Sequence, residues 1–408
     1  MKVAGGAHLT YCTNIHPGET LEEVEALLET GVAAVRRGLA SGLGPTEPMG
    51  VGLRLSARAA FALEQPGALA AFAARLARLG LYVFTLNGFP YGTFHGAPVK
   101  DRVYLPDWRD PERLRYSDSL ARILAALLPE KIEGSISTVP GAYRAHLGAE
   151  EDGTVISSNL ARHAVSLDRL RRETGRSIVL ALEPEPGCLM ESAEDAVAFF
   201  RDVVLGPEAI GLAAALGGRG REEAEALLRR HIGLCLDACH AAIAFDDPAE
   251  MMDRLRRAGI VIAKLQLSAG IEAVRPGAAE RAALRPFAED VYLHQVTVWN
   301  GKGRNGQGMT RHADLADALA SPATPDGGEE EELWRIHFHV PLWMERLDGF
   351  RTTAPWLEEL LALHRRQPVS SHLEVETYSW SVLDPRFRPP DLPAAIVREL
   401  EWVLERLS

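Results

Sequence analysis

The chain has few of the residues that mark disulfide-stabilised, nucleic-acid-binding or membrane-spanning proteins. Its 408 residues include only four cysteines, none of them in a CxxC pair, which predicts free thiols in a reducing compartment. Lysine and arginine number 44 against 56 acidic residues, and the net charge of −12 argues against a broad nucleic-acid surface. No apolar run is long enough to span a bilayer, and the first residues hold no apolar signal-peptide core. We therefore expect a cytoplasmic protein that binds no nucleic acid and has no integral membrane segment.

Short apolar runs alternate with helical patterns along the chain, which is typical of a (β/α)8 TIM barrel. Apolar residues make up 47% of the sequence, ample for a large core. Thr20-Leu-Glu-Glu23 predicts a capping box at the start of a helix that runs to about Gly38. Further helices are expected over residues 67–79, 118–128 and 393–407. The eight runs expected to be strands are residues 7–14, 51–55, 81–86, 132–139, 178–182, 232–237, 260–267 and 372–378.

Two further apolar runs, 291–299 and 334–342, lie between the seventh and the last of these strands. They predict an insertion between strands seven and eight, about residues 270–345, that lines the barrel mouth within a single domain of residues 1–408. The alternative is that one of them is itself a barrel strand. Between them, residues 321–332 are rich in glutamate, proline and glycine and are expected to form a solvated surface loop.

Polar side chains that an apolar core would reject stand at the ends of the expected strands. Asp237 ends the sixth strand and His240 follows three residues later, while Glu183 ends the fifth. Catalytic groups of such barrels lie at the C-terminal ends of the strands, and a buried carboxylate needs a cation beside it. We expect these three side chains to face one active site. Taken alone, Glu183 is about as well explained by a structural role, as a helix cap or the ion-pair partner of a nearby arginine, as by a functional one.

Two other segments place like residues at positions i and i+2, which puts them on one side of an extended strand. They are His337 with His339, and Glu374 with Glu376. Carboxylate and imidazole ligands together suit zinc, manganese, iron or cobalt. The glutamates are alternatively partners of Lys264 or of an arginine in the barrel floor, and Glu376, nearer the C-terminal end, is favoured as a ligand. Cys235 and Cys239, which flank Asp237, are interpreted as packed thiols rather than ligands.

The segment Leu234-Cys-Leu-Asp237-Ala-Cys-His240 resembles the Asp-x-x-His motif of the xylose-isomerase-like barrels, which include sugar isomerases, epimerases and endonuclease IV-type repair enzymes. Over nearly its whole length the chain more closely resembles the metabolite traffic proteins of the ebo operon, a family of xylose-isomerase-like TIM barrels. The stretches that carry this second resemblance are residues 6–19, Asn87-Gly-Phe-Pro-Tyr-Gly92, Lys264-Leu-Gln266-Leu-Ser268, Tyr292-Leu-His294-Gln295, His337-Phe-His339-Val-Pro341 and residues 374–380.

The resemblance implies a divalent metal ion held by Glu183, Asp237, a strand-seven histidine and a strand-eight glutamate, Glu376 or Glu374. Gln266 stands where that histidine is expected. Either Gln266 coordinates through its amide oxygen, or a histidine of the insertion takes the place, for which His294, His337 and His339 are candidates. His240 would bind substrate or a second metal. Further substrate contacts are expected from Asn14, His16, Asn87, Tyr91, His294 and His337.

The leading hypothesis is a metal-dependent isomerase or epimerase that acts on a small polar metabolite of the sugar or cyclitol type in secondary metabolism. Glu183 and Glu376 would also move a proton at a carbon next to a carbonyl, while His240 and Lys264 orient hydroxyl groups. The alternatives are a non-catalytic metabolite-binding or traffic component that keeps the barrel pocket and, less favoured because of the acidic charge, an endonuclease IV-like phosphodiesterase. Association with other proteins of the same operon and a homodimer both remain open.

Overall fold

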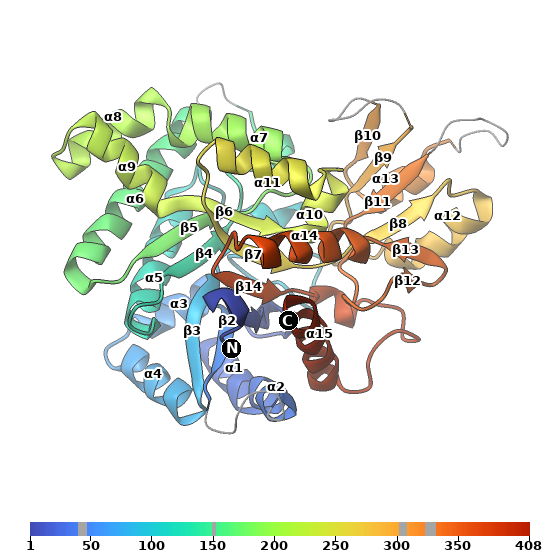
Figure 1. The fold of residues 1–408 in the computed structure, drawn as a ribbon, viewed down its shortest axis with the longest axis horizontal. Helices are drawn as coiled ribbons and strands as arrows, with labels where there is room; N and C mark the ends of the chain where they lie inside the picture. Colours follow the sequence, from blue (N-terminus) through green and yellow to red (C-terminus); the bar gives the residue numbers. More distant parts are fainter. Residues whose placement is uncertain (40–46, 149–151, 302–307, 323–331) are drawn as a thin grey trace.

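Eight parallel strands form a barrel in the computed structural model, which describes residues 1–39, 47–148, 152–301, 308–322 and 332–408 (Figure 1). Neighbouring strands follow the order β1-β14-β7-β6-β5-β4-β3-β2. The expected (β/α)8 barrel is confirmed, and each of the eight runs chosen from the sequence overlaps one barrel strand. The strands are β1 (His8–Tyr11), β2 (Met49–Arg54), β3 (Leu81–Asn87), β4 (Gly134–Thr138), β5 (Ile178–Leu182), β6 (Ile232–Asp237), β7 (Ile262–Leu267) and β14 (His372–Val375).

A threonine side chain helps to close the barrel between β1 and β2. Thr10 Oγ1 donates to the carbonyl of Gly50 at 2.8 Å and accepts from the amide of Gly52 at 2.9 Å, and Cys12 pairs with Gly52 in a parallel bridge. A Cβ at Gly52 would lie 1.8 Å from Glu374 Oε2. The absence of a side chain at this position therefore makes room for a carboxylate inside the barrel.

Helices pack around the strands, and the first begins with the expected capping box. Thr20 Oγ1 accepts from the amide of Glu23 and the Glu23 carboxylate accepts from the amide of Thr20. The helices are α1 (Leu21–Leu27), α2 (Ala33–Gly38), α3 (Ala57–Leu63), α4 (Ala68–Arg78), α5 (Pro111–Leu127), α6 (Asp152–Thr174), α7 (Ala193–Phe199), α8 (Pro207–Gly217), α9 (Arg221–His231), α10 (Ala238–Ile243), α11 (Pro248–Arg257), α12 (Ala278–Leu284), α13 (Leu315–Ala320), α14 (Ala354–Arg366) and α15 (Leu392–Leu407).

The chain between β7 and α14 forms a second, antiparallel sheet beside the barrel (Figure 1). Its order is β10-β9-β11-β8-β13-β12, so the two extra apolar runs belong to this sheet and neither is a barrel strand. The strands are β8 (Ile271–Val274), β9 (Val296–Trp299), β10 (Met309–His312), β11 (Leu333–Ile336), β12 (Arg346–Leu347) and β13 (Phe350–Thr352). Most of the acidic segment 321–332 lies outside the described residues.

The expectation that His337 and His339 lie on an extended strand is wrong. Strand β11 ends at Ile336, and the amide of Phe338 bonds back to the carbonyl of Ile336 at 2.9 Å, so the chain turns at His337. The two rings still lie on one side, with centroids 5.3 Å apart. Strands β1 and β14 likewise end earlier than expected, and a 3₁₀ turn over Thr13–Ile15 follows β1.

Within the described residues, none of the helices combines the length and the apolar character that crossing a membrane requires.

Candidate metal-binding pocket

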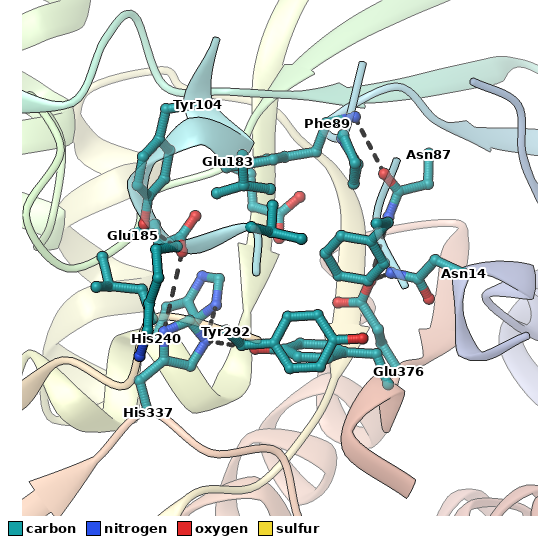
Figure 2. Close-up of a pocket in the computed structure, with 17 residues that line it drawn as sticks. Asn14, Asn87, Phe89, Tyr104, Glu183, Glu185, His240, Tyr292, His337 and Glu376 are labelled. Atoms are coloured by element: carbon teal, nitrogen blue, oxygen red, sulfur yellow. Dashed lines mark hydrogen bonds and ion pairs between the residues drawn. The ribbon is translucent and has the colours of Figure 1, made fainter. Parts of the chain in front are cut away.

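A pocket opens where the C-terminal ends of the barrel strands meet the inserted sheet (Figure 2). Its empty volume, including the open space at its mouth, is about 520 Å³. Polar groups form its base and aromatic and aliphatic side chains its walls. The polar lining residues are Asn14, Asn87, Lys100, Glu183, Glu185, His240, His337 and Glu376, and the wall residues include Phe89, Phe94, Val103, Tyr104, Tyr292, Leu293 and Tyr378.

Three carboxylates at the C-terminal ends of separate strands meet beside this pocket, which Glu183 and Glu376 line. Glu183, Asp237 and Glu376 bring oxygen atoms within 4.8 Å of one another, and each side chain is buried. Glu183 Oε2 and Asp237 Oδ2 have no hydrogen-bond partner among the described residues. Buried carboxylates this close repel one another and lose their hydration, so the arrangement suits a cation between them.

His339, from the insertion, adds a nitrogen to this group. Its Nε2 has no partner among the described residues and lies 4.0 Å from Asp237 Oδ2. Its Nδ1 lies 2.6 Å from the carbonyl of Glu376, and because a carbonyl only accepts, Nδ1 carries the proton. In the neutral ring the lone pair is then on Nε2, beside the Asp237 carboxylate, a repulsive contact that a metal ion would turn into coordination. One imidazole and three carboxylates are a donor set that zinc, manganese, iron and cobalt accept.

Asp237 is held in place by the helix that follows it. It is the N-cap of α10, where its Oδ1 accepts from the amide of His240 at 3.1 Å and from Ser268 Oγ at 2.6 Å. These two bonds occupy one carboxylate oxygen and leave Oδ2 aimed at His339. The residue thus starts a helix and presents a free oxygen to the neighbouring carboxylates and to His339.

The side-chain amides of Asn14 and Asn87 hold Glu376 in place. Asn87 Nδ2 donates to Glu376 Oε1 at 3.1 Å, and Asn14 Nδ2 donates to the same oxygen. The amide of Phe89 donates to Asn87 Oδ1 at 3.0 Å and so sets the orientation of that side chain (Figure 2). Asn14 and Asn87, expected to bind substrate, do line the pocket, and their amide groups are already engaged with Glu376.

Burial raises the pKa of Glu183 well above its usual range, and the nearby carboxylates of Glu376 and Asp237 raise it further. Without a cation, Glu183 therefore holds a proton at pH values where an exposed glutamate is ionised. Glu183 Oε2 has no hydrogen-bond partner among the described residues, whereas Glu376 Oε1 accepts two hydrogen bonds. Glu183 is the carboxyl group of this set best placed to exchange a proton with a bound molecule.

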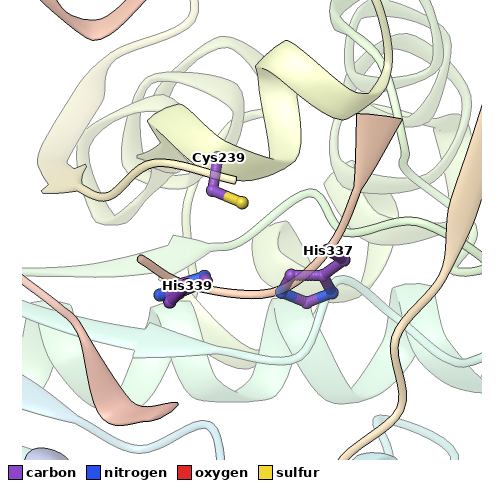
Figure 3. A group of neighbouring side chains, drawn as sticks. All are labelled: Cys239, His337 and His339. Carbon is purple, nitrogen blue, oxygen red and sulfur yellow. The ribbon is translucent and has the colours of Figure 1, made fainter. Parts of the chain in front are cut away.

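His240 and His337 line the same pocket, with Glu185 beside them. Cys239 lies next to His337 and His339 (Figure 3), where its Sγ and their nitrogens form a further close group. Burial raises the pKa of Cys239 well above that of a free thiol, as do the negative charges of Asp237 and Glu185. Cys239 is thus a neutral thiol here, in keeping with its interpretation as a packed residue.

Two strand-seven residues that were expected in the site lie away from it. Lys264 Nζ forms an ion pair of 2.7 Å with Glu374 Oε1, and both side chains are fully buried inside the barrel. Gln266 Oε1 lies 3.4 Å from Cys235 Sγ, which donates to it. Neither Lys264 nor Gln266 lines the pocket or belongs to a potential metal-binding group. Among the four side chains considered for the missing strand-seven ligand, only His339 lies beside Asp237 with a free nitrogen.

Three more expected substrate contacts also lie outside the pocket lining. His16 is buried with its Nε2 3.3 Å from Tyr11 OH. Tyr91 donates to Glu112 at 3.1 Å near the surface. His294 lies behind the pocket wall, with Nδ1 2.8 Å from the carbonyl of His337 and Nε2 2.8 Å from Glu289. His294 thus supports the backbone of a lining residue.

Sequence reasoning missed Glu185, Tyr104, Gln295 and Tyr378 as pocket residues or their direct supports. Glu185 carried a usable signal, because Pro184 and Pro186 favour extended backbone and so repeat the direction of Glu183 two residues on. Tyr104 ends a 3₁₀ helix and Gln295 lies just before β9, far apart in the chain, so their hydrogen bond of 2.8 Å leaves no local pattern in the sequence.

No family model matches the chain, and no curated protein matches it in sequence. Similar solved structures include the probable 3-DHS dehydratase AsbF of Bacillus anthracis (11% identity, TM-score 0.45, 98% of both chains covered) and the IOLI protein with a binding zinc atom (12%, 0.44, 98% of both). Another is a xylose isomerase domain protein of Planctomyces limnophilus (12%, 0.43, 87% of this chain and 86% of that one). These similarities are weak, and the barrel rests on the strand order and pairing described above.

Proposed function

We propose that the chain is a metal-dependent isomerase or epimerase for a small, uncharged polyol, sugar or cyclitol. One observation carries the proposal: Glu183, Asp237 and Glu376 bring carboxylate oxygens within 4.8 Å of one another beside an open pocket, and His339 Nε2 lies 4.0 Å from Asp237 Oδ2. A bound ion beside a carboxyl group that can move on and off it is the arrangement that proton transfer next to a carbonyl needs.

A divalent ion held by these four side chains would polarise a substrate carbonyl or hydroxyl oxygen. Glu183 would take a proton from the neighbouring carbon and return it on leaving the ion, because burial and the nearby carboxylates raise its pKa and so make it a stronger base than an exposed glutamate. Glu376, held by Asn14 and Asn87, would stay in place and keep the substrate in a fixed position. The aromatic walls would exclude bulk water from the reacting carbon.

The charges of the pocket favour an uncharged substrate. Lys100 is the one lysine or arginine in the described lining, and its ammonium group pairs with Asp314 at 2.6 Å. A sugar phosphate would find no unpaired lysine or arginine among the described lining residues to bind its phosphate group. The sequence resemblance to metabolite traffic proteins supports a place in secondary metabolism, and association with proteins of the same operon belongs to this proposal as well.

The test is hydrogen–deuterium exchange at carbon. Metal-loaded protein is incubated in D₂O with a panel of neutral aldoses, ketoses and cyclitol ketones, and exchange is followed by NMR. We expect exchange with at least one compound, slowed about 10²-fold or more by Glu183→Gln and unchanged by Glu358→Gln, which alters a carboxylate on α14. Saturable binding of a panel member without exchange would instead identify a non-catalytic binding protein and contradict the proposal.

A further inference from the structure

The part of the pocket lining that holds no carboxylate or imidazole is apolar. It is formed by the side chains of Phe89, Phe94, Val103, Tyr292 and Leu293 (Figure 2). We propose that this wall is a subsite for an apolar substituent that the substrate carries beside its reacting carbon. The inference rests on the proposed function and narrows its substrate class from simple polyols to hydroxy carbonyl compounds that carry an aromatic or aliphatic group.

Three aromatic rings form the part of the wall that adjoins the metal-binding side chains. The ring centroids lie 5.0 Å apart for Tyr292 and Tyr378, 5.1 Å for Phe94 and Tyr292, and 5.4 Å for Phe94 and Tyr378. The Tyr378 ring also lies 4.4 Å from the ring of His339. A group that contacts this aromatic cluster is therefore expected on a carbon close to the one that the ion activates.

The hydroxyl groups of two wall tyrosines already have partners inside the protein. Tyr292 OH lies 2.7 Å from His95 Nδ1, and Tyr104 OH donates to Glu185 Oε1 at 2.8 Å. These tyrosines therefore offer the pocket mainly the carbon atoms of their rings. A substrate hydroxyl placed against them would give up its hydrogen bonds to water without replacing them, which costs free energy. An apolar group loses no such bonds.

A sugar ring stacked on an aromatic face is the alternative occupant of such a wall. Stacking needs one broad, accessible ring face. The planes of Phe94, Tyr292 and Tyr378 are inclined to one another by 46° to 70°, and none of the three residues is more than 8% exposed. The cluster thus presents ring edges and parts of faces, which suit an apolar group because hydrophobic contact has no preferred direction.

Hydrogen bonds behind the wall hold its segments together. Glu19 accepts from the amide of Phe94 at 2.9 Å and pairs with Arg54 at 2.7 Å, which ties the loop after β3 to the end of β2. The amide of Val99 donates to the carbonyl of Val291 at 2.7 Å and joins the next segment of the wall to the insertion. Because the wall is built before a ligand binds, little affinity is lost to ordering it.

The test compares two hydroxy ketones that differ only in the group beside the carbonyl. Hydroxyacetone carries a methyl group there and α-hydroxyacetophenone a phenyl group, and xylulose serves as a polyol of similar size. Dissociation constants for the metal-loaded protein are measured by isothermal titration calorimetry. We expect the phenyl compound to bind about 10-fold or more tightly than either of the others, because its ring leaves water for the apolar wall.

A matched pair of variants locates the phenyl group. Val103→Thr keeps the shape of the side chain and adds a hydroxyl group to the wall, so the preference for the phenyl compound over hydroxyacetone should fall about 3-fold or more. Val274→Thr makes the same change at a valine of β8 that is 50% exposed and does not line the pocket. It should leave all three dissociation constants unchanged. Thermal denaturation checks that both variants are folded.

Tighter binding of xylulose than of α-hydroxyacetophenone would overturn the inference and make the wall a polyol site. A phenyl preference that is the same in the wild type and in folded Val103→Thr would overturn it as well. The proposed function is tested separately, by exchange at the carbon between the carbonyl and the hydroxyl group. Phenyl preference without exchange would reject the isomerase and leave the subsite, whereas exchange with neutral sugars and no phenyl preference would reject only the subsite.

Discussion

Lys264 and Glu374 form a fully buried ion pair inside the barrel, below the pocket. Burial lowers the pKa of the Lys264 amine, but the charge of Glu374 outweighs this effect and the pKa is raised, so the amine stays protonated. Lys264 was expected to orient hydroxyl groups of the substrate, but its amine is paired with Glu374 instead. Its contribution is expected to be to stability rather than to turnover.

Lys264→Met should destabilise the protein by about 3–5 kcal/mol, because it leaves an uncompensated carboxyl group in the core. The double variant Lys264→Met/Glu374→Leu should recover most of that loss, since it removes both charges. Urea denaturation of Lys264→Met, Glu374→Leu and the double variant measures the coupling free energy between the two residues. A stable Lys264→Met protein would show that the pair is not buried as described.

Glu399 is a buried acid whose carboxylate accepts hydrogen bonds from Thr377 Oγ1 at 2.6 Å and from the amide of Leu342 at 3.3 Å, next to the segments that carry Glu376 and His339. Burial raises its pKa from 4.5 to about 8, against the smaller opposing effect of these bonds. A raised folded-state pKa means that the stabilising contribution is complete below about pH 4.5 and is lost as the pH rises through about 8.

Glu399→Gln keeps an oxygen acceptor and cannot ionise. Relative to this variant, the wild type should lose stability between about pH 4.5 and pH 8, by an amount on the order of a few kcal/mol. Thermal or urea denaturation of both proteins across this range is the measurement. Parallel pH profiles for the two proteins would mean that Glu399 is ionised throughout or is reached by solvent.

At the scale of the strands, Gly52 is the position where β2 leaves space for a side chain of β14. Gly52→Ala would place Cβ against Glu374 Oε2 and 2.9 Å from the carbonyl of Tyr11. We expect a loss of about 1–3 kcal/mol from this overpacking, measured by denaturation. Gly153→Ala in α6, where a Cβ meets nothing within 4 Å, is the matched control and should be neutral or slightly stabilising. Equal effects of the two substitutions would contradict the described closure.

The strands themselves could be predicted because most are short apolar runs with polar ends. The bounds of β5 and β6 match their runs residue for residue, since both faces of these strands are buried. Strands β1 and β14 end before their apolar runs do, because the chain turns to bring Asn14 and Glu376 together across the pocket. That turn depends on a contact 362 residues apart in sequence, which no local pattern contains.

Across the whole molecule, the barrel was predictable, but not the selection among its polar residues. Glu374 and Glu376 alternate identically with apolar residues, yet one pairs with Lys264 and the other faces the pocket. Gln266 and His339 were likewise both candidates for one ligand position. The choice between them depends on the inserted sheet, which brings His339 back over the barrel. Sequence position shows which residues are unusual, whereas the fold decides which of them meet.

The central claim is that Glu183, Asp237, Glu376 and His339 surround one divalent ion, and anomalous diffraction from a crystal loaded with Mn²⁺ or Zn²⁺ tests it most directly. We expect a strong peak within coordination distance of all four side chains, and its loss in Asp237→Asn crystals. A loaded crystal with no peak among these residues, or with Asp237 directed away from it, would contradict the account.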